Sequence, residues 1–437
     1  MLQKHFLAYL DKHGSSFVEE WRHSISQIER AIRQGGELEI SESISALLRQ
    51  QGLATQLLSN NATYVYGELS TEASHTLLLC SQNDIQFSTR AQWGMFVARL
   101  IALATYQKTI GTLPVNIKWL VGIGGQKDNF ALKRFVEKYR TLLQADGCLY
   151  DLTGSTPFSS PLLATGAKGL LSVTLEVQTA SVQKDSIHGA ILPNAAWRLT
   201  WALSSLKDAR EEVLIDGFYD TLNPAGDEEI ELLHSMPDNK QALAQHLGVE
   251  NFLLQLQGFQ LRYTQLLMPS CTITGMSTSE NAQEAQHTIP SYARANVDFH
   301  LVPSQQPDDI FAKLRHHLNT QGFQDVQARI LSATSPVQTP ANDPFVQTVR
   351  RATLTAYGDK LPIIPLIPEN VLLSALCSQL NIPLVITRIG YSEFGQHATH
   401  MSNSVHSSEQ QERHIVADIK HLTMIMKGMA DATRTTE

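Results

Sequence analysis

The chain has 437 residues, of which 43% are hydrophobic and 17% charged, and its formal net charge is −8. This length exceeds a single compact core and predicts two domains. The negative charge, without a basic cluster, excludes a nucleic-acid partner, and the lack of an apolar run of about 18 residues excludes a membrane span. Four cysteines without a C-x-x-C pair predict reduced thiols in a cytoplasmic protein.

The N-terminal third has the pattern of alternating helices and strands. Residues 1–51 have the spacing of two amphipathic helices. Apolar runs that predict buried strands then alternate with helical patterns at residues 76–81, 90–106, 116–125, 131–143 and 147–154. This order predicts a largely parallel sheet covered by helices, with ligands at the carboxyl ends of its strands. Asp84, Gly124 and Asp151 fall at or just past such ends.

The pattern changes near Ala164 and changes back near Thr339. Between them lie an alternating strand, a helix, two further strands and a helix, at residues 170–178, 195–206, 271–276, 292–303 and 308–318. This order is close to a ferredoxin-like unit. The α/β pattern resumes with a helix at 344–357 and a strand at 383–390. The chain is therefore predicted to consist of a first half-domain (1–164), an inserted domain (165–335) and a second half-domain (336–437).

Several segments of the insert resemble one known family in order and spacing. They are Ile215–Glu229, Met268–Met276, His287–Pro303 and Gln306–Leu318. The family comprises the co-catalytic di-zinc metallopeptidases that include carnosine dipeptidase, aminoacylase and succinyl-diaminopimelate desuccinylase. The resemblance implies an α/β fold with a zinc-peptidase-like mixed sheet sandwiched by helices. It also implies an inserted ferredoxin-like α+β lid, through which two chains form a homodimer.

The metal-binding motifs of this family are altered in this chain. The family uses two metal ions about 3.5–4 Å apart, His and carboxylate ligands, one bridging carboxylate and a Glu base. The resemblance places the first metal-binding His at Gln82 and its orienting Asp at Asp84. The bridging Asp falls near Ala91, and the Glu-Glu pair falls on Gly125 and Gln126.

Two of the family's ligand positions keep a suitable side chain. The strand-end carboxylate corresponds to Asp151, and the last His corresponds to His400. Two dications without a carboxylate between them repel each other strongly, so a di-zinc site is not expected. We therefore expect no metal and no other cofactor, with Asp151 and His400 as residual candidates. Zinc is expected only under an alternative with one ion, held by Asp151 and His400 with His397 or Asp84.

The positions that contact substrate in the family are altered as well. In the family's D-x-H-S-G motif the His moves one place, to His188, and in the family this side chain reaches across the dimer to the oxyanion. His300 replaces the Arg that holds a substrate carboxylate. His397 lies three residues before His400 in a polar segment, where solvent-facing histidines are the commoner case. We predict His188, His400 and Asp84 as catalytic groups, and Gln82, Gln126, Asp151, His300 and His397 as ligand-binding groups.

The sequence leaves three functions open. The first is a peptidase-family homologue with a degraded metal site that binds an amino-acid or peptide-like ligand, either as a binding protein or with altered amide-bond chemistry such as transfer or condensation. The second is a metallo-hydrolase, a dipeptidase or deacylase, with a rebuilt mononuclear site. The third is a structural dimeric subunit. Activity as an enzyme is left undecided.

Overall fold

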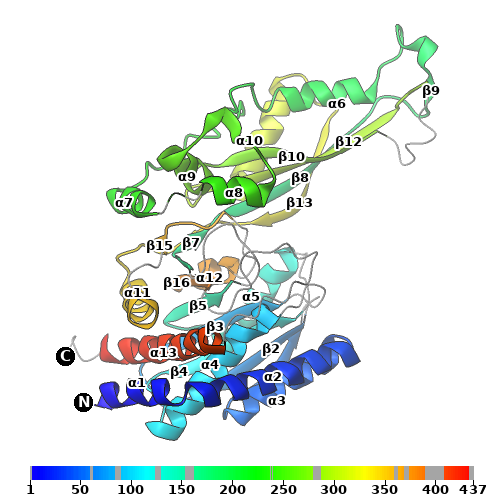
Figure 1. The fold of residues 1–437 in the computed structure, drawn as a ribbon. Helices are drawn as coiled ribbons and strands as arrows, with labels where there is room; N and C mark the ends of the chain where they lie inside the picture. The colour runs from blue at the N-terminus through cyan, green and yellow to red at the C-terminus, as the bar shows by residue number, and fades with distance from the viewer. Residues whose placement is uncertain are drawn as a thin grey trace.

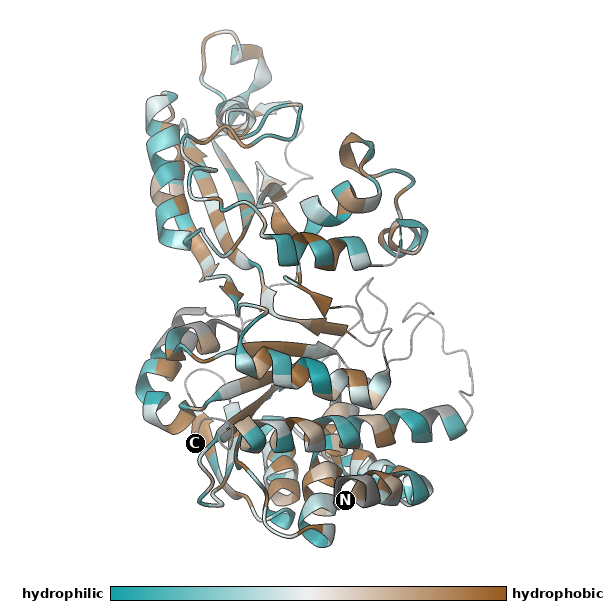
Figure 2. Ribbon diagram, turned by 90° about the vertical axis from the view of Figure 1, so that its left-hand side faces the viewer, coloured by the Kyte–Doolittle hydropathy of each residue, from teal (hydrophilic) through white to brown (hydrophobic). Residues whose placement is uncertain are grey.

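The computed structural model describes residues 2–59, 63–83, 90–123, 129–152, 162–236, 238, 240–278, 287–358, 363–368, 374–388 and 408–432. These residues form a lower α/β domain that contains both chain ends and an upper domain built from the middle of the chain (Figure 1). In both, hydrophobic residues concentrate on the strands and on the inward faces of the helices (Figure 2). Among the described residues no helix is long and apolar enough to cross a bilayer.

The lower domain is organised around an eight-stranded mixed sheet. Its strand order is β1-β2-β4-β3-β5-β16-β6-β15. The bounds are β1 (Ala54–Ser59), β2 (Thr63–Leu69), β3 (Thr76–Asn83), β4 (Asn116–Ile123), β5 (Gly147–Asp151), β6 (Leu162–Ala164), β15 (Ile363–Ile364) and β16 (Leu384–Arg388). The central strands β4, β3, β5 and β16 run parallel, so their carboxyl ends share one edge.

Helices cover both faces of this sheet, and strand alternation assigns each side chain to a face. Leu79, Trp119 and Leu149 face the larger helical layer. This layer consists of α1 (Leu2–Lys12), α2 (Gly14–Gln34), α3 (Glu37–Gln50), α4 (Arg90–Thr109), α11 (Pro344–Tyr357) and α13 (Ser408–Ala432). Cys80 and Tyr150 face the other layer, which contains α5 (Asn129–Leu143) and α12 (Ser374–Leu380).

The upper domain, which we call the lid, is a four-stranded antiparallel sheet with helices on one face. Its strand order is β10-β12-β8-β13. The bounds are β8 (Gly169–Gln178), α6 (Ala195–Ser204), β10 (Ser270–Ser277), β12 (Tyr292–Leu301), α10 (Pro307–Thr320) and β13 (Gln327–Thr334). The helices α6 and α10 pack on the buried side chains of β8 and β12, such as Val173 and Val297. With β13 the unit has the β-α-β-β-α-β order of a ferredoxin-like fold.

Short elements join the two domains. The chain passes from one to the other through β7 (Gly166–Ala167) and returns through β14 (Val337–Gln338), and these two strands pair with each other. Three helices, α7 (Asp227–Ser235), α8 (Lys240–Leu247) and α9 (Gly258–Leu267), lie on the lid side of the junction. Leu233 of α7 and Leu266 of α9 belong to the same apolar cluster as α5 and α12, so the domains share part of a core.

The expected fold class is confirmed, with local differences. The N-terminal segment forms three helices rather than two, because the chain bends at His13 and again at Gly35. The antiparallel strands β1 and β2 were not predicted, and they make the large sheet less parallel than expected. The strand β13 of the lid was not predicted either. The boundaries after residues 164 and 335 stay predictions.

A glycine in α4 is expected to be required for packing of α2 onto α4. A Cβ at Gly94 would lie 2.9 Å from the ring of Trp21, whose Nε1 donates to the Gly94 carbonyl oxygen at 2.9 Å. Replacing a helical Gly with Ala normally stabilises by up to about 1 kcal/mol, whereas overpacking costs about 1–3 kcal/mol. We expect Gly94→Ala to lower the free energy of unfolding by about 1 kcal/mol, measured by urea denaturation.

The matched control is Gly14→Ala at the start of α2. The three nearest atoms to a Cβ at Gly14 all belong to the flexible side chain of Glu412, which can rotate away. We expect this variant to be at least as stable as the wild type. A Gly94→Ala protein as stable as the Gly14→Ala protein would contradict the packing argument.

Candidate functional site

The carboxyl edge of the central parallel strands is the candidate site, and the structure describes half of the side chains predicted for it. Gln82, Asp151, His188 and His300 lie within the described residues. The other four, Asp84, Gln126, His397 and His400, lie outside the described residues, as do Gly124 and Gly125, so their predicted roles stay predictions.

Asp151, predicted as a residual metal ligand, ends β5 but does not face the open edge. Side chains alternate between the two faces of a strand, so Asp151 lies on the same face of β5 as Leu149. Leu149 packs against the helical layer that contains α4 and α13. The side chain is 2% exposed. Asp151 is therefore buried and turned away from the open edge in this structure, and its predicted role as a ligand stays a prediction.

The partner of Asp151 is Arg99 in the middle of α4. The Nε of Arg99 donates to Asp151 Oδ2 at 2.6 Å, and its Nη2 donates to Oδ1. Thr387 of β16 donates its hydroxyl to Oδ1 at 3.0 Å and accepts from Arg99 at 3.2 Å. Arg99 is 1% exposed, so the two residues form a bidentate ion pair in the buried interior. Burial opposes the charge of Arg99, but the Asp151 carboxylate outweighs burial and raises the pKa of Arg99.

A second buried carboxyl group lies beyond Arg99. Asp418 of α13 accepts a hydrogen bond from the hydroxyl of Tyr357 at the end of α11. Burial raises the pKa of Asp418 to about 7, against the lowering effects of the Tyr357 hydrogen bond and of the Arg99 charge. In the same layer, His421 lies 2.9 Å from the Thr353 hydroxyl, and burial together with the Arg99 charge lowers its pKa well below the usual value. One arginine thus lies among two carboxyl groups and a neutral imidazole.

Gln82 lies on the opposite face of the sheet from Asp151. It follows Leu78 and Cys80 in the alternation of β3, so it belongs to the α5 side, where it is half-buried opposite Gly122 of β4. A neutral amide in this position accepts or donates hydrogen bonds but binds zinc poorly. The described part of the edge therefore offers a hydrogen-bonding group on one face and a neutralised acid on the other.

His300 lies at the end of β12 where the lid meets the junction. The side chain is half-buried, and burial, followed by the charge of Lys168, lowers its pKa. The Lys168 Nζ is itself held by the carbonyl oxygens of Gln265 at 2.7 Å and Met268 at 2.5 Å, and burial lowers its pKa to about 8. His300 is therefore largely neutral at pH 7. It cannot supply the full positive charge of the Arg that stands at this position in the family the chain resembles.

His188 is not brought to the sheet edge within one chain. It ends the short helix η1 (Ser186–His188), which follows β9 (Lys184–Asp185) and is exposed. The ribbon of β9 and β11 (Thr288–Ile289) lies at the far end of the lid (Figure 1). A role for His188 therefore requires a second chain, as the resemblance implies.

The described residues do not fit a metal centre. Among them no three His, Cys, Asp or Glu side chains form a group that could hold an ion. Asp151 is the one ligand candidate of the sequence that the structure describes, and both of its oxygens are engaged. The ligands of a bound metal ion would have to come, at least in part, from residues outside the described ranges.

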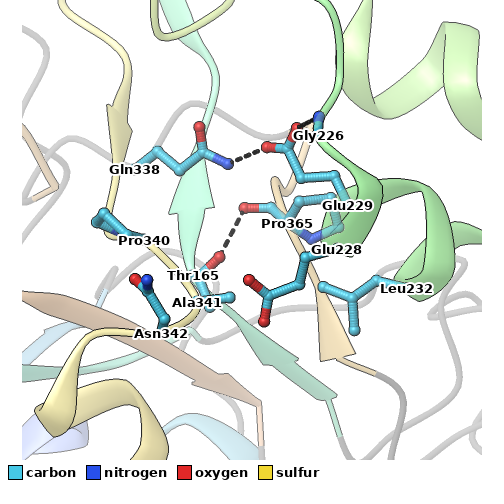
Figure 3. A pocket seen from close by; sticks show the side chains of 10 residues that line it. All are labelled: Thr165, Gly226, Glu228, Glu229, Leu232, Gln338, Pro340, Ala341, Asn342 and Pro365. Atoms are coloured by element: carbon cyan, nitrogen blue, oxygen red, sulfur yellow. Dashed lines mark hydrogen bonds between the residues drawn. The ribbon is translucent and has the colours of Figure 1, made fainter.

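A separate pocket lies at the domain junction and contains none of the predicted site residues. Its volume is about 390 Å³, and its walls include Thr165, Glu228, Gln338 and Pro365 (Figure 3). The amide of Gln338 donates to Glu229 of α7 at 2.6 Å, and the Thr165 hydroxyl donates to the Pro365 carbonyl oxygen at 3.1 Å. The Gln338–Glu229 bond joins α7 to the connecting strand β14, and the Thr165–Pro365 bond joins the segments that follow β6 and β15.

Comparisons with known proteins agree with this architecture. Residues 165–326 match the model of the M20 peptidase dimerisation domain. An M20 family metallo-carboxypeptidase from Sulfolobus solfataricus superposes with a TM-score of 0.75 at 23% identity, covering 91% of this chain and 99% of that one. This chain is related to the M20 peptidases. Human carnosine dipeptidase 1 has a TM-score of 0.72 at 18% identity, with 99% of both chains covered.

A sequence relative points to the same group. The Beta-Ala-His dipeptidase of Rattus norvegicus is 23% identical over 274 residues, which cover 61% of this chain and 55% of the relative. The match thus spans about half the length of this curated relative.

The expectation of no cofactor needs correction. The lid is that of the M20 peptidases, and the structures with this fold include a metallo-carboxypeptidase, so the family to which the chain is related uses metal ions. The altered motifs alone did not justify expecting none. What the structure adds is that both carboxylate oxygens of Asp151 accept hydrogen bonds, from Arg99 and Thr387.

The raised pKa of Asp418 predicts how stability depends on pH. The pKa of Asp418 in the folded protein, about 7, lies above the ordinary value of 3.8. The contribution of Asp418 to the free energy of unfolding is therefore full below about pH 3.8 and is lost as pH rises through about 7. Asp418→Asn mimics the neutral acid. We expect this variant to match the wild type below about pH 3.8, to become progressively more stable than the wild type between about pH 3.8 and 7, and to exceed it at pH 8 by at most about 4 kcal/mol. Chemical denaturation at several pH values measures this.

Tyr357→Phe provides the matching variant. It removes the hydrogen bond that favours the Asp418 anion, so the loss of stability should extend to higher pH than in the wild type. Identical pH profiles for wild type, Asp418→Asn and Tyr357→Phe would show that the carboxyl group does not titrate as described.

Proposed function

We propose that the protein is an amide-bond hydrolase of the dipeptidase type, with the M20 fold and an altered metal site that holds one ion rather than two. It would take an amino-acid or peptide-like ligand between the carboxyl edge of the large sheet and the lid. The fold similarity over nearly the whole chain and the lid match support this class of ligand. The observation that carries the altered site is the Arg99–Asp151 pair.

The argument for a single ion is electrostatic. Two close dications need a carboxylate between them, and Ala91 stands near the family's bridging position. Asp151 is already neutralised by Arg99, which removes a further anion. Asp84, His397 and His400 remain as the proposed ligand set. The half-buried His300 would donate a hydrogen bond to a ligand carboxylate, more weakly than a guanidinium would.

Protein purified without chelator should contain about one metal ion per chain by elemental analysis. It should hydrolyse members of a dipeptide panel that includes β-alanyl-histidine and acyl amino acids. We expect His400→Ala to lose both metal and turnover, since imidazole is a principal zinc ligand. His246→Ala, an exposed histidine of α8, is the control and should change neither.

Two results would contradict this proposal. Two ions per chain would show that the di-zinc arrangement persists, and turnover unaffected by chelator would remove the metal from the reaction. The Arg99–Asp151 pair also favours a second candidate, a binding protein without turnover. A rise in the thermal midpoint with a dipeptide, without hydrolysis, would support that candidate.

We further propose that the chain acts as a homodimer through the lid, and that it resides in the cytoplasm, which its four free and buried cysteines favour. β10 lies at an edge of the lid sheet, and its Ile273 and Met276 are 48% and 55% exposed. On α6, Trp197 and Trp201 are more than half exposed and stack on each other with ring centroids 6.0 Å apart. Exposed aromatic and apolar groups of this kind are typical of interfaces.

A charge placed in this surface should separate the two chains. We expect Trp201→Glu to convert the dimer to a monomer at micromolar concentration, measured by size exclusion with light scattering, because a buried unpaired charge opposes association. Leu38→Glu is the control, since Leu38 of α3 is equally exposed but lies in the other domain. A monomeric wild type, or a Trp201→Glu protein that remains dimeric, would overturn this assignment.

A further inference from the structure

The Arg99–Asp151 pair engages an acid that, in the family this chain resembles, is a metal ligand. In the family that this chain resembles, the acid that corresponds to Asp151 at the end of β5 binds a metal ion. In this structure the same acid is bound by a guanidinium from the helix beneath the sheet. We infer that Arg99 is the built-in counter-ion of Asp151, and that any metal ion held by this chain is coordinated without Asp151.

Both oxygens of Asp151 already accept hydrogen bonds from the groups around them. Oδ2 accepts from Arg99 Nε, and Oδ1 accepts from both Arg99 Nη2 and Thr387. An ion that approached either oxygen would meet a guanidinium at hydrogen-bonding distance from the same carboxylate. Like charges at such separation repel strongly in a buried site.

Displacement of Arg99 by an ion is unfavourable for a second reason. The guanidinium stays charged at all relevant pH values, and its side chain is 1% exposed. Away from Asp151 it would remain as a cation in a layer whose buried apolar residues include Phe96, Leu103 and Ile419. Asp418 is the other acid whose charge acts on Arg99, and it is bonded to Tyr357.

The test uses the full-length chain and zinc chloride as the probe. Three proteins are compared: wild type, Asp151→Asn, and the double variant Arg99→Met with Asp151→Leu. The double variant replaces the pair with apolar side chains of similar size, an exchange that buried pairs tolerate. It therefore provides a folded protein even if Asp151→Asn, which leaves Arg99 unpaired, does not fold.

We expect the zinc-induced shift in the thermal midpoint, and the bound zinc per chain, to be the same in all variants that fold. If no protein responds to zinc, the thermal midpoints without zinc decide the outcome, and a lack of coupling between Arg99 and Asp151 would then overturn the inference. Loss of a wild-type zinc response in the double variant or in Asp151→Asn would overturn it. This outcome is independent of turnover, so failure of the proposed hydrolase activity is distinguishable from failure of this inference.

The thermal unfolding midpoints without zinc provide a second measurement. We expect Arg99→Met alone to lower the midpoint by roughly 5–10 °C, and the double variant to recover most of this loss. Arg198→Met is the matched control, because Arg198 pairs with Asp325 on the lid surface and exposed pairs contribute little. A double variant no more stable than Arg99→Met would show that the two side chains are not coupled.

Discussion

The arrangement of the lower domain depends on one buried ion pair. Arg99 and Asp151 join α4 to the end of β5, and Thr387 joins both to β16. Removing one partner of such a pair costs about 3–5 kcal/mol, whereas replacing both can be neutral. The net contribution of the pair to stability is therefore small. Its main effect is to favour the one arrangement in which the acid at the end of β5 faces the helical layer.

This constraint relates the retained fold to the altered metal site that we propose. The sheet, the helical layers and the lid follow the M20 plan over nearly the whole chain. The fold itself does not determine the chemistry, which depends on the side chains at the edge. Here a fixed internal cation neutralises one acid, and Gln82 supplies an uncharged amide. Under the proposed function, these two described side chains supply less negative charge than a pair of dications requires.

Much of the fold could be predicted from the sequence because local signals agreed. The strand at 76–83 is a short apolar run, and α11 starts at Pro344 after Asp343, whose carboxylate caps Phe345 N–H. β13 was missed because its sequence, QARILSAT, has weak alternation and a bulge at Ile330/Ser332. The helices α7 to α9 are short, and much of their position comes from contacts at the junction.

The candidate site was predicted only in part. The sequence correctly located Asp151 at the end of a strand but did not indicate which face it occupies. One signal was present: Arg99 is a lone charge within the apolar stretch of α4, and buried charges are almost always paired. Its partner comes from a strand 52 residues away, which spacing cannot reveal.

The central claim is that Asp151 pairs with Arg99 and does not coordinate a metal ion. Anomalous X-ray diffraction at the zinc edge, from crystals grown with zinc, tests this most directly. The account predicts guanidinium density on the Asp151 carboxylate and no anomalous peak within bonding distance of its oxygens. A zinc peak about 2 Å from Asp151, with Arg99 turned away, would contradict it.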